Sequence, residues 1–393
     1  MRYFPRIIEK TIKDCLAIFP AVGITGPRQS GKSTTLQKVF GRQYRYVTFD
    51  DPLTVNFFES DPRGFMEKYG NKVIFDEVQK SPEIFHYLKL AIDQDRQNRG
   101  KFILAGSSHF SFVKHITESL AGRIGLLSLL PFQRQEITKN LRAKQILKGS
   151  YPELVSRKYT KAKEWYAAYV NNYIERDVRS LYNVGNLRDF QRLVNLLAAR
   201  AAQELNMSVL ANDLGVSVKT VQQWISILEA SYIIFLLPSY HKNLGKRIVK
   251  RPKLYFYDTG LICYLTGIQD EDALSQGPMD GAVFENYVIA EVKKMVLHKN
   301  LDIQLFYFRS NLGLESDLIL EDKRKRTVRF IEIKTGKTAK YAMVKNLKKL
   351  IALEKQSKHI VKVKVTGHLV YKGKTEEFLD GIQLQNFSNF LGV

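Results

Sequence analysis

Short apolar runs, each ended by small, acidic or proline residues, dominate the first third of the chain. They cover residues 19–24, 46–49, 72–75, 101–105 and 124–131. Continuous apolar runs of this length are typical of strands that are buried on both faces of a parallel sheet. Together with a helix expected over residues 34–40, the pattern predicts an α/β domain over residues 1–135.

A glycine-containing loop follows the first of these runs. Its residues fit the pattern G-x-x-x-x-G-K-[ST] and continue into one further threonine: Gly26, Pro27, Arg28, Gln29, Ser30, Gly31, Lys32, Ser33 and Thr34. The glycines let the backbone curl, so that its N–H groups and the positive end of the next helix surround a phosphate chain. We expect Lys32 to reach the β- and γ-phosphates and Ser33 to ligate Mg²⁺. The alternative is a fortuitous glycine-rich turn, against which the flanking strand and helix argue.

Polar residues border three further runs at positions suited to phosphoryl chemistry. Asp76 and Glu77 follow the third run, and we expect Asp76 to hold Mg²⁺ through water and Glu77 to polarise an attacking water. Ser107 follows the fourth run and is a candidate sensor of the γ-phosphate. Arg123 precedes the fifth run and is a candidate arginine finger, supplied within the chain or to a neighbouring subunit. The structural alternatives are solvated acids at a strand end, a capping serine and a surface arginine.

The pattern changes to helical spacing after residue 135. We interpret residues 136–187 as a helical lid or linker and residues 188–258 as a winged helix-turn-helix. Gly215 makes the turn and Ser217 caps the second helix, whose core-facing residues are expected to be Val218, Val221, Ile225 and Leu228. Its outward residues are candidates for a DNA major groove: Lys219, Thr220, Gln222 and Gln223. The wing strands are expected over residues 233–237 and 254–257, with a basic tip of Lys242, Lys246, Arg247, Lys250 and Arg251. The alternative is a module that only packs.

The remaining residues, 259–393, are predicted to form a second α/β domain. A helix over residues 282–297 places Glu285 in an apolar column, which is unusual for a carboxylate. Two strands surround the charged turn at residues 322–327, and symmetry about its centre pairs Asp317 with Glu332. Period-2 alternation then puts Glu332 and Lys334 on one face beside Asp317, with Glu285 as a candidate third acid. The alternative is a surface hairpin with alternating charges.

Several of these motifs together resemble those of a known family. The series GPRQSGKST, FDDP, VIFDEVQKSPEIF, FILAGSS and ESLAGR is similar to that of prokaryotic AAA-type ATPases of the archaeal-ATPase-like group. In that group an ATPase core precedes a winged helix and a C-terminal domain with a restriction-endonuclease-like fold. The resemblance covers essentially the whole chain and implies ATP as the ligand, with Lys32, Ser33, Asp76 and Glu77 at the matching positions.

The C-terminal acids and lysine also resemble a nuclease site, the PD-(D/E)XK type. This resemblance implies that Asp317 and Glu332, with Glu285 as a third ligand, bind a Mg²⁺ ion that activates water, while Lys334 positions that water. The chain departs from the pattern because Glu315 and Ser316 precede Asp317 where a proline would be tidier. Many relatives of this fold bind without cutting, so cleavage stays open.

Charge and composition narrow the partners. The net charge of +22 over 393 residues indicates an anionic partner, with nucleic acid as the usual one and acidic membranes as the alternative. Cys15 and Cys263 are the only cysteines, which suits a reducing cytoplasm better than a disulfide framework or zinc site. We expect a soluble, cytoplasmic protein without a secretory signal or a membrane span, because the most apolar stretch, residues 225–238, is short and contains Glu229.

The leading hypothesis is a Mg²⁺-dependent ATPase whose nucleotide state controls a winged-helix and nuclease-like module acting at DNA. One rival is a nucleotide-gated switch or assembly protein that uses its C-terminal half for protein contacts. Another is an active Mg²⁺ nuclease in which ATP only gates access. A homo-oligomer fits any of the three hypotheses.

Overall fold

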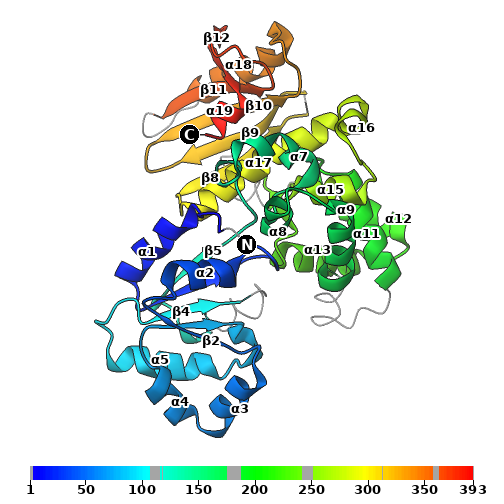
Figure 1. Ribbon diagram of the computed structural model, residues 1–393. Coiled ribbons are helices and arrows are strands. Elements are labelled where there is room, and N and C mark those ends of the chain that lie inside the picture. The colour runs from blue at the N-terminus through cyan, green and yellow to red at the C-terminus, as the bar shows by residue number, and fades with distance from the viewer. Residues whose placement is uncertain are drawn as a thin grey trace.

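The computed structural model describes residues 3–106, 116, 118–174, 187–240, 251–311, 313–356 and 363–392. Three parts follow one another along the chain: an N-terminal α/β domain, a middle region of helices and a C-terminal domain built on a second sheet (Figure 1). Ser107 and four residues of the expected wing tip, Lys242, Lys246, Arg247 and Lys250, lie outside the described residues. Within the described ranges, no helix is long and apolar enough to cross a membrane.

The N-terminal domain confirms the predicted P-loop type of α/β fold. Its parallel sheet has the order β2-β3-β4-β1-β5. The strands are β1 (Ala21–Thr25), β2 (Arg45–Thr48), β3 (Val73–Asp76), β4 (Phe102–Ala105) and β5 (Ile124–Ser128). The helices are α1 (Ile8–Ile18), α2 (Lys32–Phe40), α3 (Pro52–Ser60), α4 (Pro62–Tyr69), η1 (Val78–Lys80) and α5 (Ile84–Gln94).

Helices cover both faces of this sheet, as continuous apolar strands require. α1 and α2 contribute to one apolar cluster, with Ile12 and Leu36 against Val22 of β1. α3 to α5 contribute to another cluster, with Phe58 and Leu88 against buried strand residues. Asp51 and Asp61 cap α3 and α4 with their side chains, and a proline occupies the first turn of each helix.

The middle region is helical from η2 (Arg134–Glu136) onward. Its further elements are η3 (Lys139–Lys144), α7 (Gln145–Lys148), α8 (Pro152–Ser156), α9 (Ala162–Tyr169), the π-helical η4 (Val170–Ile174), α11 (Leu187–Ala199), α12 (Met207–Leu214), α13 (Val218–Ala230), α15 (Thr259–Leu265) and α16 (Glu271–Gln276). One apolar cluster joins Tyr151 and Trp165 to Leu193 of α11, Ile225 of α13 and Ile262 of α15. Because α15 shares this core, the residues directly after 258 pack with the helices, and we place the start of the C-terminal domain at α17 and not at residue 259.

The helix–turn–helix segment forms as expected. Gly215 ends α12 with φ of 69°, a conformation that suits glycine, and the Ser217 side chain caps α13 through the Thr220 N–H. Val221, Ile225 and Leu228 are buried, whereas Val218 is 40% exposed, so its predicted core position is wrong. Val218 is the first residue of α13 and lies where the helix has not yet reached the core. Lys219, Gln222 and Gln223 are exposed, and Thr220 is half-buried.

The hairpin of β6 (Ile234–Leu237) and β7 (Lys253–Phe256) is antiparallel and follows α13. It packs against the C-terminal domain along its described length. Asn286 of α17 (Asp280–His298) bonds to both backbone groups of Phe256, with its Oδ1 accepting from the N–H and its Nδ2 donating to the carbonyl oxygen, each at 2.8 Å. The Tyr240 N–H donates to the Tyr307 carbonyl oxygen at 2.7 Å. The hairpin is therefore part of an interface.

The C-terminal domain holds a mixed sheet between two helices. The sheet order is β12-β13-β11-β10-β9-β8. Its elements are β8 (Ile303–Arg309), β9 (Glu315–Asp322), β10 (Thr327–Lys334), α18 (Tyr341–Gln356), β11 (Lys364–Tyr371), β12 (Phe378–Leu379), β13 (Ile382–Asn386) and the short α19 (Phe387–Phe390). Leu318 and Ile331 belong to the α17 side of the sheet, whereas Ile319 and Phe330 belong to the α18 side. Period-2 alternation therefore supplies apolar side chains to both faces of the sheet. Figure 1 shows the sheet with α17 and α18 packed near it.

Candidate nucleotide site and C-terminal carboxylate cluster

The predicted phosphate loop lies between the carboxyl end of β1 and the start of α2. Gly26 has φ of 146°, and a Cβ there would lie 2.1 Å from the Leu129 carbonyl oxygen, so no side chain fits. Gly31 has φ of 90° and precedes the first residue of α2, Lys32. The backbone from Pro27 to Ser30 forms the body of the loop, and Thr34 is exposed on the first turn of the helix. The loop therefore has the left-handed conformations for which its glycines were expected.

Lys32 is buried over the loop. Its Nζ donates to the carbonyl oxygens of Gly26 and Pro27, each at 2.9 Å. The ammonium group therefore lies against the concave backbone that was predicted to surround phosphate.

Asp76 and Ser33 approach each other through a tyrosine that sequence reasoning missed. Asp76, the last residue of β3, is 2% exposed, and its Oδ2 accepts a hydrogen bond of 2.5 Å from the Tyr46 hydroxyl of β2. Ser33 and Gln37 lie near this hydroxyl and act on its pKa in the lowering direction. Burial, followed by the hydrogen bond to Asp76, raises the pKa of Tyr46 to about 12, so the group stays protonated and donates. The sequence feature that could have revealed Tyr46 is its hydroxyl, a polar group within the strand β2 that pairs with β3, the strand that ends in Asp76.

These contacts fit a hydrated Mg²⁺ ion. The Ser33 hydroxyl and the Asp76 carboxylate both lie near Tyr46, and oxygen donors of these kinds suit Mg²⁺. Glu77 follows at the strand end with φ of 53°, its carboxylate accepts a hydrogen bond from Gln79, and its N–H donates to Asp76 Oδ1 at 3.1 Å. β4, which precedes Ser107, lies between β1 and β3 in the sheet.

A cavity of about 410 Å³ opens beside the loop. Its walls come from the loop and α2, from the N-terminal segment, from the segment after β5 and from α8: Tyr3, Phe4, Arg6, Gln29, Gly31, Thr34, Thr35, Lys38, Phe132, Pro152, Glu153 and Ser156. Phe4 and Phe132 pack with ring centroids 5.6 Å apart. The N-terminal residues carried no motif, so only the fold reveals them as part of this site.

Arg123 lies at the opposite edge of the sheet. Its carbonyl oxygen accepts from the N–H of Ala21, the first residue of β1, so the whole of that strand separates it from the phosphate loop. Its guanidinium makes a bidentate pair with Asp93 at 2.7 and 2.9 Å. The structure does not bring Arg123 to the nucleotide site of its own chain, which corrects the within-chain form of the arginine-finger hypothesis.

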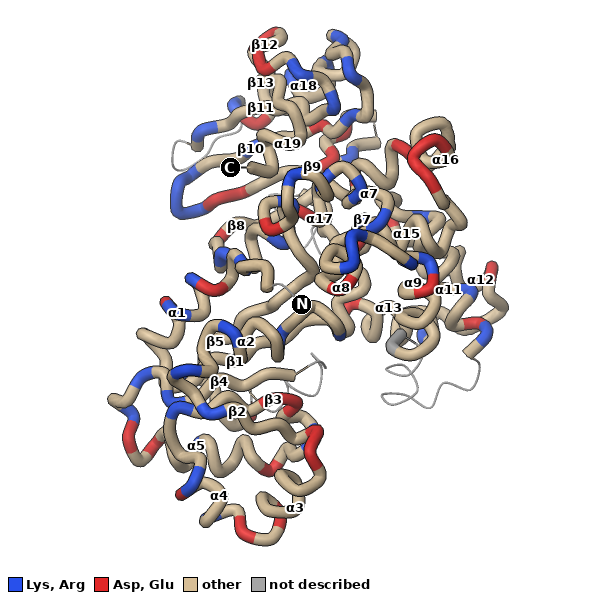
Figure 2. The backbone as a smooth tube through the Cα atoms, viewed as in Figure 1, with Lys and Arg blue, Asp and Glu red and all other residues tan. Residues whose placement is uncertain are grey.

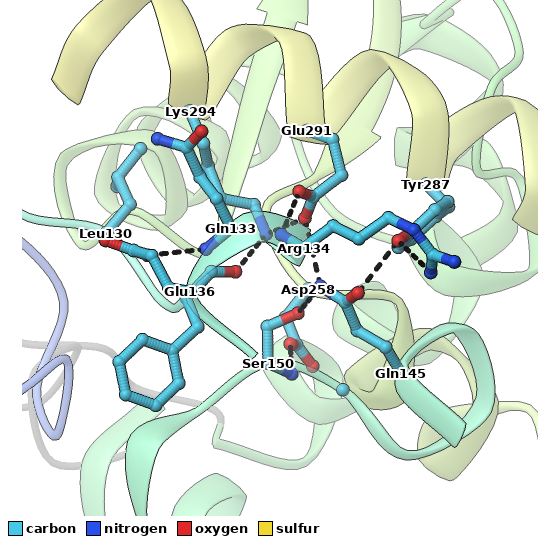
Figure 3. A network of polar contacts seen from close by, with 12 residues as sticks. Leu130, Gln133, Arg134, Glu136, Gln145, Ser150, Asp258, Tyr287, Glu291 and Lys294 are labelled. Atoms are coloured by element: carbon cyan, nitrogen blue, oxygen red, sulfur yellow. Dashed lines mark hydrogen bonds and ion pairs between the residues drawn. The ribbon is translucent and has the colours of Figure 1, made fainter. Parts of the chain in front are cut away.

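Buried polar groups hold the segment after β5 against α17 (Figure 3). The Arg134 N–H donates to Glu291 Oε2 at 2.6 Å, and Lys294 Nζ donates to the Phe132 carbonyl oxygen at 3.0 Å. The Leu130 N–H donates to His298 Nε2 at 3.0 Å. Burial lowers the pKa of His298 well below its usual value, which keeps the ring neutral and able to accept.

The predicted C-terminal cluster also assembles. The β9–β10 register pairs Leu318 with Ile331, so the next pair is Asp317 with Glu332, as the symmetric turn predicted. Lys334 Nζ lies 2.6 Å from Glu332 Oε1 and 4.0 Å from Asp317 Oδ2. The Ile333 N–H donates to Asp317 Oδ2 at 2.8 Å.

A second lysine, Lys253 at the start of β7, enters this cluster and was missed. Its Nζ lies 3.1 Å from Glu285 Oε1, 3.1 Å from Glu315 Oε1 and 3.9 Å from Asp317 Oδ1. The Tyr255 hydroxyl also donates to Glu285 Oε1, at 2.7 Å. Lys253 and Tyr255 are two residues apart on one strand face, a period-2 signal that the expected wing obscured.

Burial and charge shape the protonation of the cluster. Burial first and the charge of Asp317 second raise the pKa of Glu332 to about 8 and that of Glu285 to about 7. Burial alone would lower the pKa of Lys253, but Glu285, Asp317 and Glu315 outweigh it and raise that pKa above its usual value. The ammonium group of Lys253 therefore stays charged and is shared by the carboxylates of Glu285, Glu315 and Asp317.

The cluster does not fit the predicted metal centre. Among the described residues, no group of three or more His, Cys, Asp or Glu is arranged to hold a metal ion. Glu285, Asp317 and Glu332 each face an ammonium group, and Lys253 lies among the oxygens that a Mg²⁺ ion would need. The expected ligand set is thus corrected to a set of ion pairs.

The glycine loop, the acidic strand end and the sheet order define the N-terminal domain as a P-loop domain of the AAA type. Residues 19–138 match a family model described as an AAA domain. Residues 139–272 and 280–389 match two models described as domains of unknown function, DUF8612 and DUF4143.

Whole-chain comparisons find relatives of undetermined function. The chain is 29% identical over 304 residues to the uncharacterized protein Rv2008c of Mycobacterium tuberculosis, covering 77% of this chain and 68% of the relative. It is 23% identical over 342 residues to the uncharacterized protein MJ1544 of Methanocaldococcus jannaschii, covering 78% and 73%. A solved Walker-type ATPase of Pyrococcus abyssi is 14% identical and has a TM-score of 0.47, with 67% of this chain and 96% of that chain covered.

Proposed function

We propose that this protein is a Mg²⁺-dependent ATPase whose nucleotide state is passed to its helical and C-terminal parts. The observation that carries the proposal is the hydrogen bond of the Tyr46 hydroxyl to Asp76, with Ser33 nearby, beside a phosphate loop over which Lys32 is buried. These groups come from three different elements, α2, β2 and β3. A chance glycine turn has no reason to place them together.

Nucleotide binding follows from this geometry. The loop N–H groups and the N-terminus of α2 bind the phosphates, and Lys32 exchanges its two carbonyl partners for the β- and γ-phosphate oxygens. The cavity beside the loop takes the base near Tyr3, Phe4 and Phe132. Mg²⁺ held by Ser33 and, through water, by Asp76 neutralises charge on the phosphates.

Hydrolysis requires a positioned water. Glu77 is the residue that we assign to this role, because it follows Asp76 directly at the strand end. Ser107 remains our proposed sensor of the γ-phosphate, since the strand that it follows lies between β1 and β3.

A path for the nucleotide state leads from the loop to the other domains. Arg6 Nη1 donates to the Ser30 carbonyl oxygen at 2.9 Å, and its Nε pairs with Glu136. Thr25 and Ser128, at the ends of β1 and β5, share hydrogen bonds of 2.6 and 3.0 Å with the Tyr232 hydroxyl after α13. Arg6 also donates to the Leu130 carbonyl oxygen, and the Leu130 N–H donates to His298 of α17, so a change in the loop reaches groups that contact both later parts of the chain.

We propose DNA as the partner of the helical and C-terminal parts. Supporting it are the net charge of +22 and the exposed residues Lys219, Gln222 and Gln223 of α13. Lys and Arg lie in every part of the described chain, interspersed with acids (Figure 2). The second candidate is a nucleotide-gated switch that acts through protein contacts. The packed β6–β7 hairpin favours it, because strands fixed in an interface are not free to act as a wing. Homo-oligomers are compatible with both candidates.

The test is ATP turnover with and without DNA on matched variants. Wild type should hydrolyse ATP only with Mg²⁺, Lys32→Ala should lose nucleotide binding, and Glu77→Gln should bind ATP without turnover. Normal turnover by Glu77→Gln would refute its assigned role. DNA binding that weakens steeply with salt supports the DNA proposal, and its absence at low ionic strength leaves the switch.

A further inference from the structure

Lys253 is a buried lysine at the junction of three elements. Its side chain is 5% exposed, and its Nζ lies within 4.0 Å of carboxylates from α17 and β9. A buried ammonium is stable only with paired charges, and Glu285, Glu315 and Asp317 provide them. The lysine itself belongs to β7, before the C-terminal domain begins.

We infer that Lys253 is the resident cation of this carboxylate cluster, so that the cluster acts as an ionic clasp between the β6–β7 hairpin and the C-terminal domain and not as a Mg²⁺ centre. This inference does not depend on ATP hydrolysis. It also separates the C-terminal domain from the nuclease chemistry that its D…E-x-K sequence suggested.

The oxygen atoms of the cluster show why Lys253 takes the place of a metal ion. Glu285 Oε1 meets both Lys253 and the Tyr255 hydroxyl. Asp317 Oδ2 accepts from the backbone of Ile333, while its Oδ1 faces Lys253. Glu332 Oε1 pairs with Lys334. A divalent ion would have to displace the Lys253 ammonium, which is buried and paired with these carboxylates.

The clasp is continuous with other contacts that hold the hairpin. Asn286, one residue after Glu285, bonds to both backbone groups of Phe256. The Tyr307 hydroxyl of β8 donates to the Arg251 carbonyl oxygen at 2.5 Å. Removing the Lys253 charge leaves three acids facing one another in a buried site, and their repulsion should loosen β7 first.

The first experiment measures Mn²⁺ binding by electron paramagnetic resonance, without nucleotide, in full-length Asp76→Asn protein. This background removes the carboxylate ligand of the ATP site, so the C-terminal acids are the remaining predicted carboxylate ligands. We expect the same Mn²⁺ binding with and without the further substitution Asp317→Asn, because the C-terminal cluster holds no Mn²⁺ ion. A Mn²⁺ site that depends on Asp317 would overturn the inference, and this experiment does not require any Lys253 variant to fold.

The second experiment measures hydrogen exchange at residues 253–256. Lys253→Met should speed exchange there by about tenfold or more and lower the melting temperature. Adding Glu285→Gln should restore part of the loss, because one of the uncompensated charges is removed. Lys372→Met is the matched control, since Lys372 pairs with Asp280 at 3.0 Å on the same domain but is outside the cluster. Equal protection of residues 253–256 in wild type and Lys253→Met would overturn the inference.

Discussion

Arg6 and Glu136 form a buried ion pair next to the phosphate loop, with 3.1 Å between Nε and Oε1. Their side chains are 2% and 1% exposed. Arg6 also donates to the carbonyl oxygens of Ser30 and Leu130, and Glu136 accepts from the N–H groups of Ile7 and Gln133. One pair thus joins the N-terminal segment, the loop and the start of the middle region.

Removal of one partner of this pair should destabilise the protein strongly. Arg6→Met leaves Glu136 buried without its countercharge, which typically costs about 3–5 kcal/mol. The double variant Arg6→Met/Glu136→Gln should lose less than the sum of the two single variants. Denaturant unfolding measures this, with Arg192→Met, from the surface pair with Asp189, as a control expected to change little. If the losses of unfolding free energy in the two single variants add up to the loss in the double variant, Arg6 and Glu136 are not coupled and the prediction is wrong.

Tyr46→Phe should weaken the response to Mg²⁺ and leave the binding of metal-free nucleotide unchanged. The lost hydroxyl orients Asp76, and loss of a group that supports a metal ligand typically costs about 10–100-fold in metal affinity. Titration of Mg²⁺ in the ATPase assay measures the shift. Tyr44→Phe is the matched control, because its hydroxyl bonds to Gly100 away from the loop. An unchanged Mg²⁺ dependence in Tyr46→Phe would refute the role of Tyr46.

Arg123→Ala should leave ATP binding unchanged, because Arg123 lies at the far edge of the sheet and pairs with Asp93. At protein concentrations low enough to dissociate any oligomer, turnover should stay within about twofold of wild type, far from the 10³–10⁵-fold effect of an arginine finger. Turnover measured over a range of protein concentrations tests this. A large loss at the lowest concentrations would show that Arg123 acts within its own chain.

The stability of the C-terminal domain should fall as pH rises from about 4.5 to 8. The pKa of Glu332 rises from 4.5 to about 8 on folding, with burial as the main cause, so the folded state binds more protons than the unfolded state across this window. Stability then declines as protons are lost, and it is greatest below the unfolded pKa. Glu332→Gln should flatten this dependence in thermal unfolding, whereas Glu377→Gln, at an exposed position, should retain it. A steeper decline of stability with pH in Glu332→Gln would contradict the predicted direction of the contribution of Glu332.

Local patterns predicted the elements that depend on neighbouring residues. The glycine loop, the buried strands, the α12–α13 turn and the pairing of residue 317 with residue 332 all follow from spacing within short windows. Val218 is an exception. Its place in the helical repeat matches the core-facing positions, but it is the first residue of α13, and this end of the helix lies outside the core.

Contacts between distant segments were not predictable from these windows. Arg6, Tyr46 and Lys253 lie in no motif, and their roles come from neighbours 130, 30 and 32 residues away along the chain. The role of Lys253 reverses one prediction, because its ammonium lies where a metal ion was expected.

The amino-acid order alone determined that a phosphate loop, a pair of acids after a buried strand, and a carboxylate–lysine hairpin would form. Periodicity and turn chemistry act over a few residues, so the chain encodes them locally. Tertiary structure decided which side chains share each site. It placed Tyr46 between Ser33 and Asp76, moved Arg123 to the far edge and placed Lys253 among the C-terminal acids. The reason is physical: a buried charge requires a partner, and only the packing of distant elements determines which partner it meets.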